Sequence, residues 1–250
     1  MEALPYVKEM TLRRSEIERL DVYPFSIPAV RELVHLEFGK EVTFFVGENG
    51  SGKSTLLEAI AVGLGFNPEG GTRNFNFVTR GSHSNLYKYL TLSKSYLRPK
   101  DGFFLRAESY FNVATNIEHM DAEHAPSPPV INSYGGVSLH EQSHGESFLS
   151  LVLHRFGGKG IYLLDEPEAA LSPTRQLAVL SRMRQLIKDK SQFIIATHSP
   201  ILLAYPGASI YLIDGSGISP VKYEDTEHYE VTKAFLENPQ RMLDELFLEN

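Results

Sequence analysis

The sequence predicts an α/β fold, in which a mainly parallel β-sheet is flanked by helices. Short apolar runs alternate with stretches of helical composition along most of the chain, as in strands joined by crossover helices. Two of these runs end directly in charged or polar residues, which is typical of buried parallel strands at the carboxyl edge of a sheet. A third run leads into a glycine-rich turn and then a helix, the arrangement of an anion-binding loop.

Composition places the chain among globular proteins. It has 250 residues, of which 42% are hydrophobic and 22% charged, so it can form one large domain or two small ones. It contains no cysteine, no apolar run of about 18 residues and no N-terminal segment of the secretory type. The sequence therefore predicts no disulfide, no membrane span and a cytoplasmic location.

The net charge is −7. Proteins that bind DNA across their whole surface are usually basic, so this charge gives no support for nucleic-acid binding. A local basic groove stays compatible with it. Basic residues between positions 72 and 100 are scattered among tyrosines, and ordinary surface charge is the favoured interpretation there.

The first 40 residues contain three prolines, which argue against one long helix. The alternating apolar residues from Arg31 to Phe38 predict a strand that ends at the Gly39-Lys40 turn. Tyr23 and Phe25 are candidates for contact with an adenine ring. Packing in the core or in a turn is the favoured interpretation for each of them.

The glycine-rich turn matches the phosphate-binding template G-x-x-x-x-G-K-[ST]. Val42–Val46 before it predicts a buried parallel strand, and residues 56–62 after it predict a helix. Glycine allows positive φ and lets backbone N–H groups approach an anion at the helix N-terminus. Lys53 would reach the β- and γ-phosphates, and the Ser54 hydroxyl would bind Mg²⁺. The predicted nucleotide-binding residues of this loop are Gly47, Glu48, Asn49, Gly50, Ser51, Gly52, Lys53, Ser54 and Thr55.

Further apolar runs predict the other strands and helices of the sheet. Helical spacing of apolar residues predicts a helix over Arg175–Ile187, and the tail from Glu227 to Leu248 predicts two short helices divided at Asn238-Pro239. The remaining strands are predicted at 103–107, 160–164, 193–196 and 210–213.

An apolar strand ends in the acidic pair Asp165 and Glu166. A carboxylate at the end of a buried strand is costly unless it faces a cation or a hydrogen-bond network. Beside a phosphate loop that cation is Mg²⁺, which Asp165 would hold, and Glu166 would polarise the water that attacks the γ-phosphate. The alternative is a simple turn at the end of the strand, which Asp-Glu-Pro also suits.

His198 follows the next apolar strand. Because consecutive strand ends open at one edge of a parallel sheet, His198 should lie near Glu166 and the phosphates. There it would donate a hydrogen bond to the γ-phosphate or to the attacking water. The alternative is a structural histidine.

Ser143 and Gly145 precede an amphipathic run that begins at Phe148. A serine and a glycine at a helix start supply a hydroxyl and free N–H groups for an anion. Taken in isolation, an ordinary N-cap is favoured, because Ser143 with Glu146 three residues later also forms a capping box.

These four motifs, in their order along the chain and at about their spacing there, resemble the ABC-type ATPase domain. The loop at 47–55 looks like its Walker A motif, residues 142–146 its signature motif, and residues 161–166 its Walker B motif with the catalytic glutamate. Residues 169–172 occupy its D-loop position, and His198 that of its switch histidine. The amino-acid sequences at 165–173 and 196–202 are similar to those of soluble SMC-like and RecF-like predicted AAA-family ATPases.

Two positions depart from the family pattern. His144 stands where the first signature glycine is expected, and no Q-loop glutamine follows the strand at 103–107. Glu108 occupies the Q-loop position and would serve as a water-mediated Mg²⁺ ligand. The segment between the Walker A helix and the signature is too short for the coiled coil of true SMC proteins.

The resemblance implies a single ABC-type domain over residues 1–250, with an N-terminal antiparallel β portion and residues 67–140 as an irregular, partly helical lobe. It implies Mg²⁺-dependent ATP hydrolysis, with Glu166, His198 and Lys53 as catalytic residues. It also implies an ATP-dependent homodimer in which Ser143 and Gly145 touch the partner's nucleotide. DNA maintenance or defence is suggested by relatives alone. The alternatives are an ATP-binding subunit of an ABC transporter and a monomeric P-loop kinase or nucleotide-gated binding module.

Overall fold

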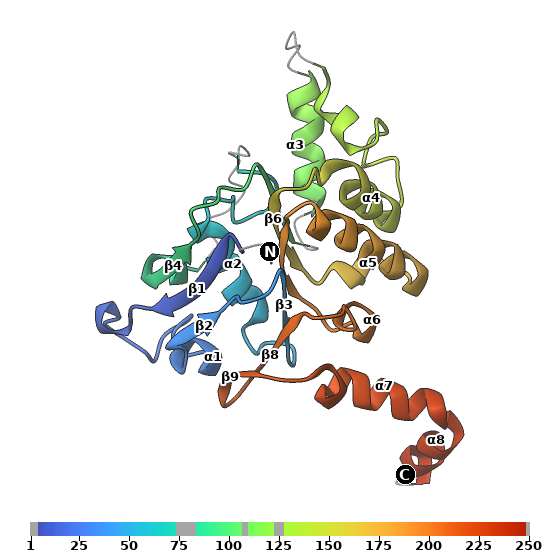
Figure 1. Ribbon diagram of the computed structural model, residues 1–250. Coiled ribbons are helices and arrows are strands. Elements are labelled where there is room, and N and C mark those ends of the chain that lie inside the picture. The colour runs from blue at the N-terminus through green and yellow to red at the C-terminus, as the bar shows by residue number, and fades with distance from the viewer. Residues whose placement is uncertain (1–4, 74–83, 107–109, 123–127, 249–250) are drawn as a thin grey trace.

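The computed structural model describes residues 5–73, 84–106, 110–122 and 128–248. Figure 1 shows a central sheet with helices on both sides and a smaller sheet next to helix α2. The six central strands lie in the order β5 (Asp101–Arg106), β6 (Gly160–Asp165), β7 (Gln192–Ala196), β3 (Val42–Val46), β8 (Ser209–Asp214) and β9 (Gly217–Pro220). Adjacent strands from β5 to β8 pair in parallel, and β9 returns antiparallel to β8.

This arrangement confirms the predicted α/β fold with a mainly parallel sheet. Each predicted strand of the central sheet is present, and β3 has the predicted bounds. β9 was not predicted from the sequence. Its four residues end in a proline on an outer strand, where the absent N–H breaks no hydrogen bond to a further strand.

The second sheet is the N-terminal antiparallel portion. Its strands lie in the order β2 (His35–Glu37), β1 (Val7–Leu12) and β4 (Leu90–Lys94). The strand expected over Arg31–Phe38 is shorter than predicted, because Pro28 begins the short helix α1 (Pro28–Arg31) and α1 takes up the first of those residues. In strand β4 only Leu90 is buried, so its side chains do not alternate clearly between a buried face and an exposed face.

The helices fall on two sides of the central sheet. Helix α2 (Lys53–Gly63) follows the glycine-rich loop and packs with the antiparallel sheet. The other side carries α3 (Tyr110–Ala122), α4 (His144–Ser150), α5 (Pro173–Lys188) and α6 (Pro200–Leu203). Two further helices form the C-terminal part, α7 (Glu227–Glu237) and α8 (Pro239–Leu248), and they divide at the predicted Asn238-Pro239 boundary.

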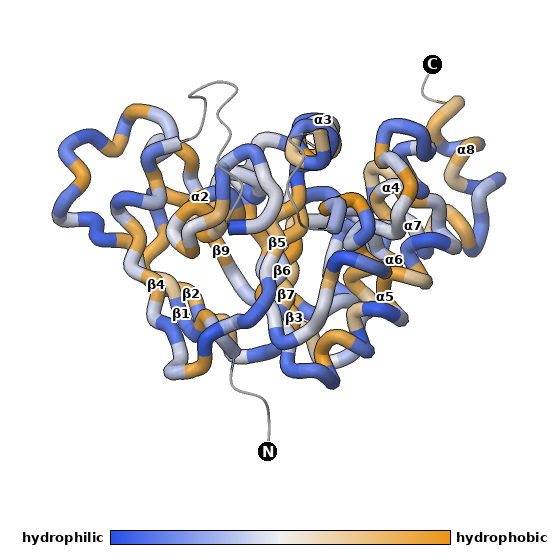
Figure 2. The backbone as a smooth tube through the Cα atoms, turned by 90° about the horizontal axis from the view of Figure 1, so that it is seen from above, coloured by the Kyte–Doolittle hydropathy of each residue, from blue (hydrophilic) through white to orange (hydrophobic). Residues whose placement is uncertain are grey.

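Two apolar cores fill the space between these layers. Side chains of a strand point to alternate faces, so Phe44 and Ile195 belong to the core under α3 to α6, whereas Phe45 and Ile194 belong to the core under α2. Figure 2 shows the apolar strands at the centre of the molecule, between helices of mixed polarity. Among the described residues, no helix combines the length and the apolar composition that crossing a membrane requires.

The residues predicted to form an irregular lobe, 67–140, include two strands. β4 pairs with β1 in the antiparallel sheet, and β5 forms one edge of the central sheet. The helix α3 and a 3₁₀ turn at Val130–Tyr134 pack together on the side of the sheet opposite α2.

Candidate functional site

The register of the central sheet brings the predicted motifs to one edge. Phe45, Ala196 and Asp165 lie in one row, since Ala196 pairs with both of the others across β7. The loop after β3, the acidic pair after β6 and the histidine after β7 therefore leave the sheet side by side. This is the meeting point that the parallel topology predicts.

Glycine is required at two positions of the loop. Gly47 has a φ of +146°, and a Cβ there would overlap the carbonyl oxygen of Ile213 on β8. Gly52, with a φ of +107°, precedes α2, and a Cβ there would lie 2.8 Å from the Ile27 side chain. Both positions need a residue without a Cβ, so the loop can wrap closely around the helix start.

Lys53 is buried, at 3% exposure, in the first turn of α2. Its Nζ donates to the carbonyl oxygens of Gly47 and Glu48, both at 2.8 Å. Burial lowers the pKa of Lys53, while the carboxylates of Glu166, Asp165 and Glu168 oppose that shift. The loop lysine and the acidic residues after β6 therefore lie within electrostatic reach of each other.

The Ser54 hydroxyl and the Asp165 carboxylate are in direct contact. Ser54 Oγ donates to Asp165 Oδ1 at 2.9 Å, although the two residues are 111 positions apart. Asp165 is 8% exposed at the end of β6. Two oxygen atoms that can bind a metal ion thus lie together beside the phosphate loop. Oxygen ligands are the type that Mg²⁺ prefers.

Glu166 has different surroundings from its neighbour. It is partly exposed, its backbone lies in the left-handed region at φ 49°, and its N–H donates to the carbonyl of Ala196 at 2.9 Å. Its Oε1 is 3.5 Å from Nε2 of His198. The turn after β6 thus points Glu166 away from the core and toward the histidine of the next strand end.

His198 is held at both its backbone and its ring. Its N–H donates to Glu168 Oε1 at 2.5 Å, and its Nδ1 is 3.0 Å from Nε2 of His228. Burial is the largest cause of its lowered pKa, and the positive charge of Lys53 acts in the same direction. The neutral form of His198 is therefore favoured over the charged form, and Nε2 is directed toward Glu166.

Two residues of this cluster have no counterpart in the predicted site. Glu168 accepts from the Thr197 hydroxyl at 2.7 Å as well as from the His198 N–H, and burial raises its pKa. A third acid two positions after Glu166 is the only sequence signal for it. His228 comes from α7, which follows β8 and β9 in the chain, and no motif in the surrounding sequence marks it.

The motif at 142–146 has the geometry of a capping box. The Ser143 N–H and hydroxyl both donate to Glu146 Oε2, at 3.0 and 2.6 Å, and Ser143 is the N-cap of α4. Gly145 is buried, and a Cβ there would overlap the carbonyl oxygen of Ala170 and lie 2.5 Å from Arg175 Nη1. His144 is exposed. Within one copy of the chain, these residues serve helix capping and close packing.

Glu108 lies outside the described residues. The strand before it, β5, ends at Arg106, which pairs in register with Asp165. The two aromatic candidates differ in position. Phe25 is buried and packs edge-on against Tyr89, whereas Tyr23 is 64% exposed, with its hydroxyl oxygen 3.5 Å from Thr55 Oγ1.

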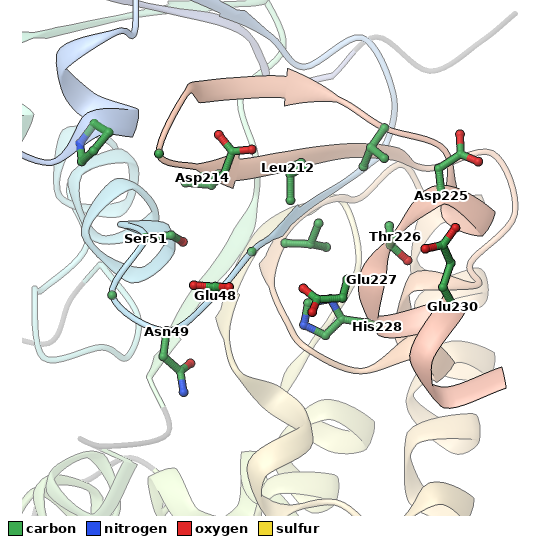
Figure 3. A pocket seen from close by; sticks show the side chains of 17 residues that line it. Glu48, Asn49, Ser51, Leu212, Asp214, Asp225, Thr226, Glu227, His228 and Glu230 are labelled. Carbon is green, nitrogen blue, oxygen red and sulfur yellow. The ribbon is translucent and has the colours of Figure 1, made fainter. Parts of the chain in front are cut away.

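A pocket of about 600 Å³ opens along the loop. Figure 3 shows Glu48, Asn49 and Ser51 on one wall and the first turn of α7 on the other. Several carboxylates line it away from the loop, so an anion is disfavoured at the end of the pocket that α7 forms. The carboxylates that line the pocket are Glu48, Asp214, Asp225, Glu227 and Glu230.

Two family models match the chain in succession. Residues 25–110 match an AAA domain, and residues 105–204 match a model described as "AAA domain, putative AbiEii toxin, Type IV TA system". The first match covers the phosphate loop, and the second covers the acidic pair and His198.

Two curated proteins each match 72% of this chain. An "Uncharacterized ABC transporter ATP-binding protein" of Haemophilus influenzae is 25% identical over 72% of this chain and 73% of its own length. A "Putative ABC transporter ATP-binding protein" of Caldanaerobacter subterraneus is 27% identical over 72% of this chain and 80% of its own.

A solved structure titled as an inward-facing conformation of a "putative metal-chelate type ABC transporter" matches 91% of this chain and 88% of its own. The TM-score is 0.50 at 15% identity, so this likeness shows the fold. Residues 25–110 and 105–204 thus match AAA domain models, the two curated relatives are named as ABC transporter ATP-binding proteins, and the fold is similar to that of this solved structure.

Proposed function

We propose that this chain binds ATP with Mg²⁺ and hydrolyses it to ADP and phosphate, as one domain over residues 1–250. The observation that carries the proposal is the 2.9 Å contact between the Ser54 hydroxyl and Asp165, which joins the phosphate loop to the acidic strand end. A simple turn after β6 would not explain why a buried carboxylate meets the hydroxyl of the loop.

Ser54 and Asp165 would hold the Mg²⁺ ion. Both offer oxygen ligands, and Mg²⁺ in nucleotide sites keeps several waters and phosphate oxygens besides one or two protein ligands. Glu108, at the expected Q-loop position, is proposed as a further ligand through water. An ion held by these residues would supply positive charge that stabilises the triphosphate.

Three residues would carry the reaction. Lys53, which donates to the loop carbonyls in the structure, would turn to the phosphates and stabilise their charge. Glu166 would take the proton of the attacking water, since it is partly exposed beside the loop. His198 would donate from Nε2 and hold the transferred phosphoryl group in line.

Two copies of the chain would enclose two nucleotides. In that assembly Ser143 and Gly145 of one copy would reach the γ-phosphate held by Lys53 of the other. The Ser143 hydroxyl donates to Glu146 within its own chain, so contact in trans requires it to exchange that acceptor for phosphate. His144, in place of a glycine, adds an exposed side chain at the same surface.

A second candidate function is the ATP-binding subunit of a transporter. The names of two curated relatives favour it, and co-purification with a membrane partner would support it. A monomeric kinase or nucleotide-gated module is favoured only if Ser143 acts solely as a cap. The SMC-like or RecF-like relation and a role in DNA maintenance or defence remain predictions from sequence.

Phosphate release, measured as a function of chain concentration, tests the proposal. The wild type should hydrolyse Mg²⁺-ATP, and its specific rate should rise with concentration if two copies form each site. Lys53→Ala should abolish ATP binding, as measured with a fluorescent nucleotide, because it removes the phosphate-binding cation. Unchanged nucleotide affinity in Lys53→Ala contradicts the loop assignment, and a specific rate independent of concentration contradicts the dimer.

A further inference from the structure

His228 lies against the switch-position histidine, although no sequence motif marks it. Its Nε2 is 3.0 Å from Nδ1 of His198, and the ring centroids are 5.1 Å apart. His228 belongs to the first turn of α7, and Figure 3 shows its ring on the pocket wall beside Glu227. Helix α7 thus contributes a side chain to the centre of the proposed site.

The start of α7 is anchored to the loop that carries His198. Thr226, 2% exposed, caps α7 and donates from Oγ1 to the carbonyl of Tyr223 at 2.7 Å. The Tyr223 hydroxyl in turn donates at 2.9 Å to the carbonyl of Pro200, two residues after His198. These bonds hold the two histidines at a defined separation rather than leaving His228 on a free helix end.

The Glu166 carboxylate decides which of the two histidine rings donates the hydrogen bond between them. Nε2 of His198 faces Glu166 Oε1 at 3.5 Å, and an ionised carboxylate only accepts. A proton on Nε2 is therefore favourable. A neutral imidazole carries one N–H, so Nδ1 of His198 must then accept, and Nε2–H of His228 must donate.

Burial disfavours the charged form of both rings. Burial is the largest cause of the lowered pKa of each histidine. The charge of His198 lowers the pKa of His228 further, and Lys53 on α2 lowers both values. Glu166 opposes the shift at His198, and Glu227 and Glu168 oppose it at His228. With one proton per ring, the donor and acceptor pattern between them is fixed.

We infer that His228 is a positioning residue for the proposed hydrolysis. Its Nε2–H donates to Nδ1 of His198 and thereby keeps the proton of His198 on Nε2, the atom that faces Glu166 and would face the phosphoryl group. This inference rests on the proposed function for its catalytic consequence, whereas the tautomer of His198 exists with or without hydrolysis.

Steady-state kinetics test the catalytic consequence. His228→Leu should lower kcat about tenfold and leave KM for ATP within about twofold, since partners that orient a histidine are typically worth about 10–100-fold. His228→Gln should recover most of kcat, because its amide N–H reaches a similar position. His119→Leu, the same substitution at an exposed position of α3, is the matched control and should behave as wild type.

A double-variant comparison separates positioning from general damage. If His228 acts through His198, His228→Leu should cost nothing further in a His198→Ala background. An equal loss of kcat in that background, or wild-type kcat in His228→Leu, overturns the inference. Circular dichroism and thermal melting check that each variant folds.

Nitrogen NMR of the histidine rings decides the tautomer directly. The wild type should show His198 protonated at Nε2 and unprotonated at Nδ1, and His228→Leu should shift it toward a mixture of tautomers. A wild type protonated at Nδ1 overturns the inference. If the chain hydrolyses no ATP, the proposed function fails, while the NMR result still decides the role of His228.

Discussion

The two acids after β6 show how neighbouring residues acquire different chemistry. Asp165 ends the buried strand and accepts from Ser54, so its carboxylate is committed to the loop. Glu166 enters a left-handed backbone conformation that turns it out of the core toward His198. In the proposed reaction, Asp165 would hold Mg²⁺ and Glu166 would meet the attacking water.

Glu166→Gln should bind ATP but lose turnover by about 10²–10⁴-fold, since the amide keeps the shape of the side chain and removes its basicity. Phosphate release and nucleotide affinity, measured on the same preparation, check this. Glu237→Gln, the same substitution at an exposed position of α7 outside the pocket, should leave both quantities unchanged. Wild-type turnover in Glu166→Gln would remove Glu166 as the base.

At the scale of elements, the start of α4 is tied to the segment that follows Glu166. The capping box fixes the first turn of α4, and Gly145 brings its backbone against the carbonyl of Ala170. The short 3₁₀ helix Pro167–Ala170 leads from the acidic pair to this contact. The signature-like and D-loop-like segments are therefore neighbours within one chain.

Gly145→Ala should destabilise the fold by about 1–3 kcal/mol, because a Cβ overlaps backbone that cannot move like a flexible side chain. Urea denaturation measures the loss. Gly39→Ala is the matched control, since a Cβ at Gly39 meets no atom within 4 Å. Equal stability of the two variants would contradict the close packing of α4 on this segment.

At the scale of the whole molecule, the layered fold brings distant segments to one edge and buries ionisable groups there. His198 and His228 both have lowered pKa values in the folded state, chiefly through burial. The charged groups that face them are Lys53, Glu166, Glu168 and Glu227.

Stability should fall as pH drops below the unfolded histidine value of about 6.5. The unfolded chain then takes up protons that the folded rings resist, so the contribution of these histidines is full above that pH and is lost as pH falls through the folded values. Urea unfolding at pH 7.5 and pH 5.5 should show a smaller loss for His198→Gln/His228→Gln than for wild type. Identical losses would contradict the shifts.

Assembly is also a property of the whole molecule. Glu166→Gln with saturating Mg²⁺-ATP should give a two-chain mass in light scattering, because blocked turnover preserves the nucleotides between the copies. Lys53→Ala/Glu166→Gln, which should not bind ATP, is the control and should stay at the one-chain mass. A single-chain mass for Glu166→Gln at saturating nucleotide would remove the proposed sandwich.

Local sequence accounts for much of the fold and the site. The run at 42–46, the glycines of the loop and the apolar strand before Asp165 each specify their own conformation through side-chain type and spacing. Parallel topology then predicts that their ends converge, and the observed register agrees with that expectation.

Other features depend on contacts between segments that are far apart in the chain. His228 meets His198 only because β8 and β9 return the chain to the loop, and Tyr23 differs from Phe25 in exposure only because of what packs on each. Strands β1 and β4 pair across about 80 residues without a strong pattern in β4. Periodicity reports the local conformation of a segment, whereas a long-range partner is selected by the burial and hydrogen bonding that the assembled layers make available.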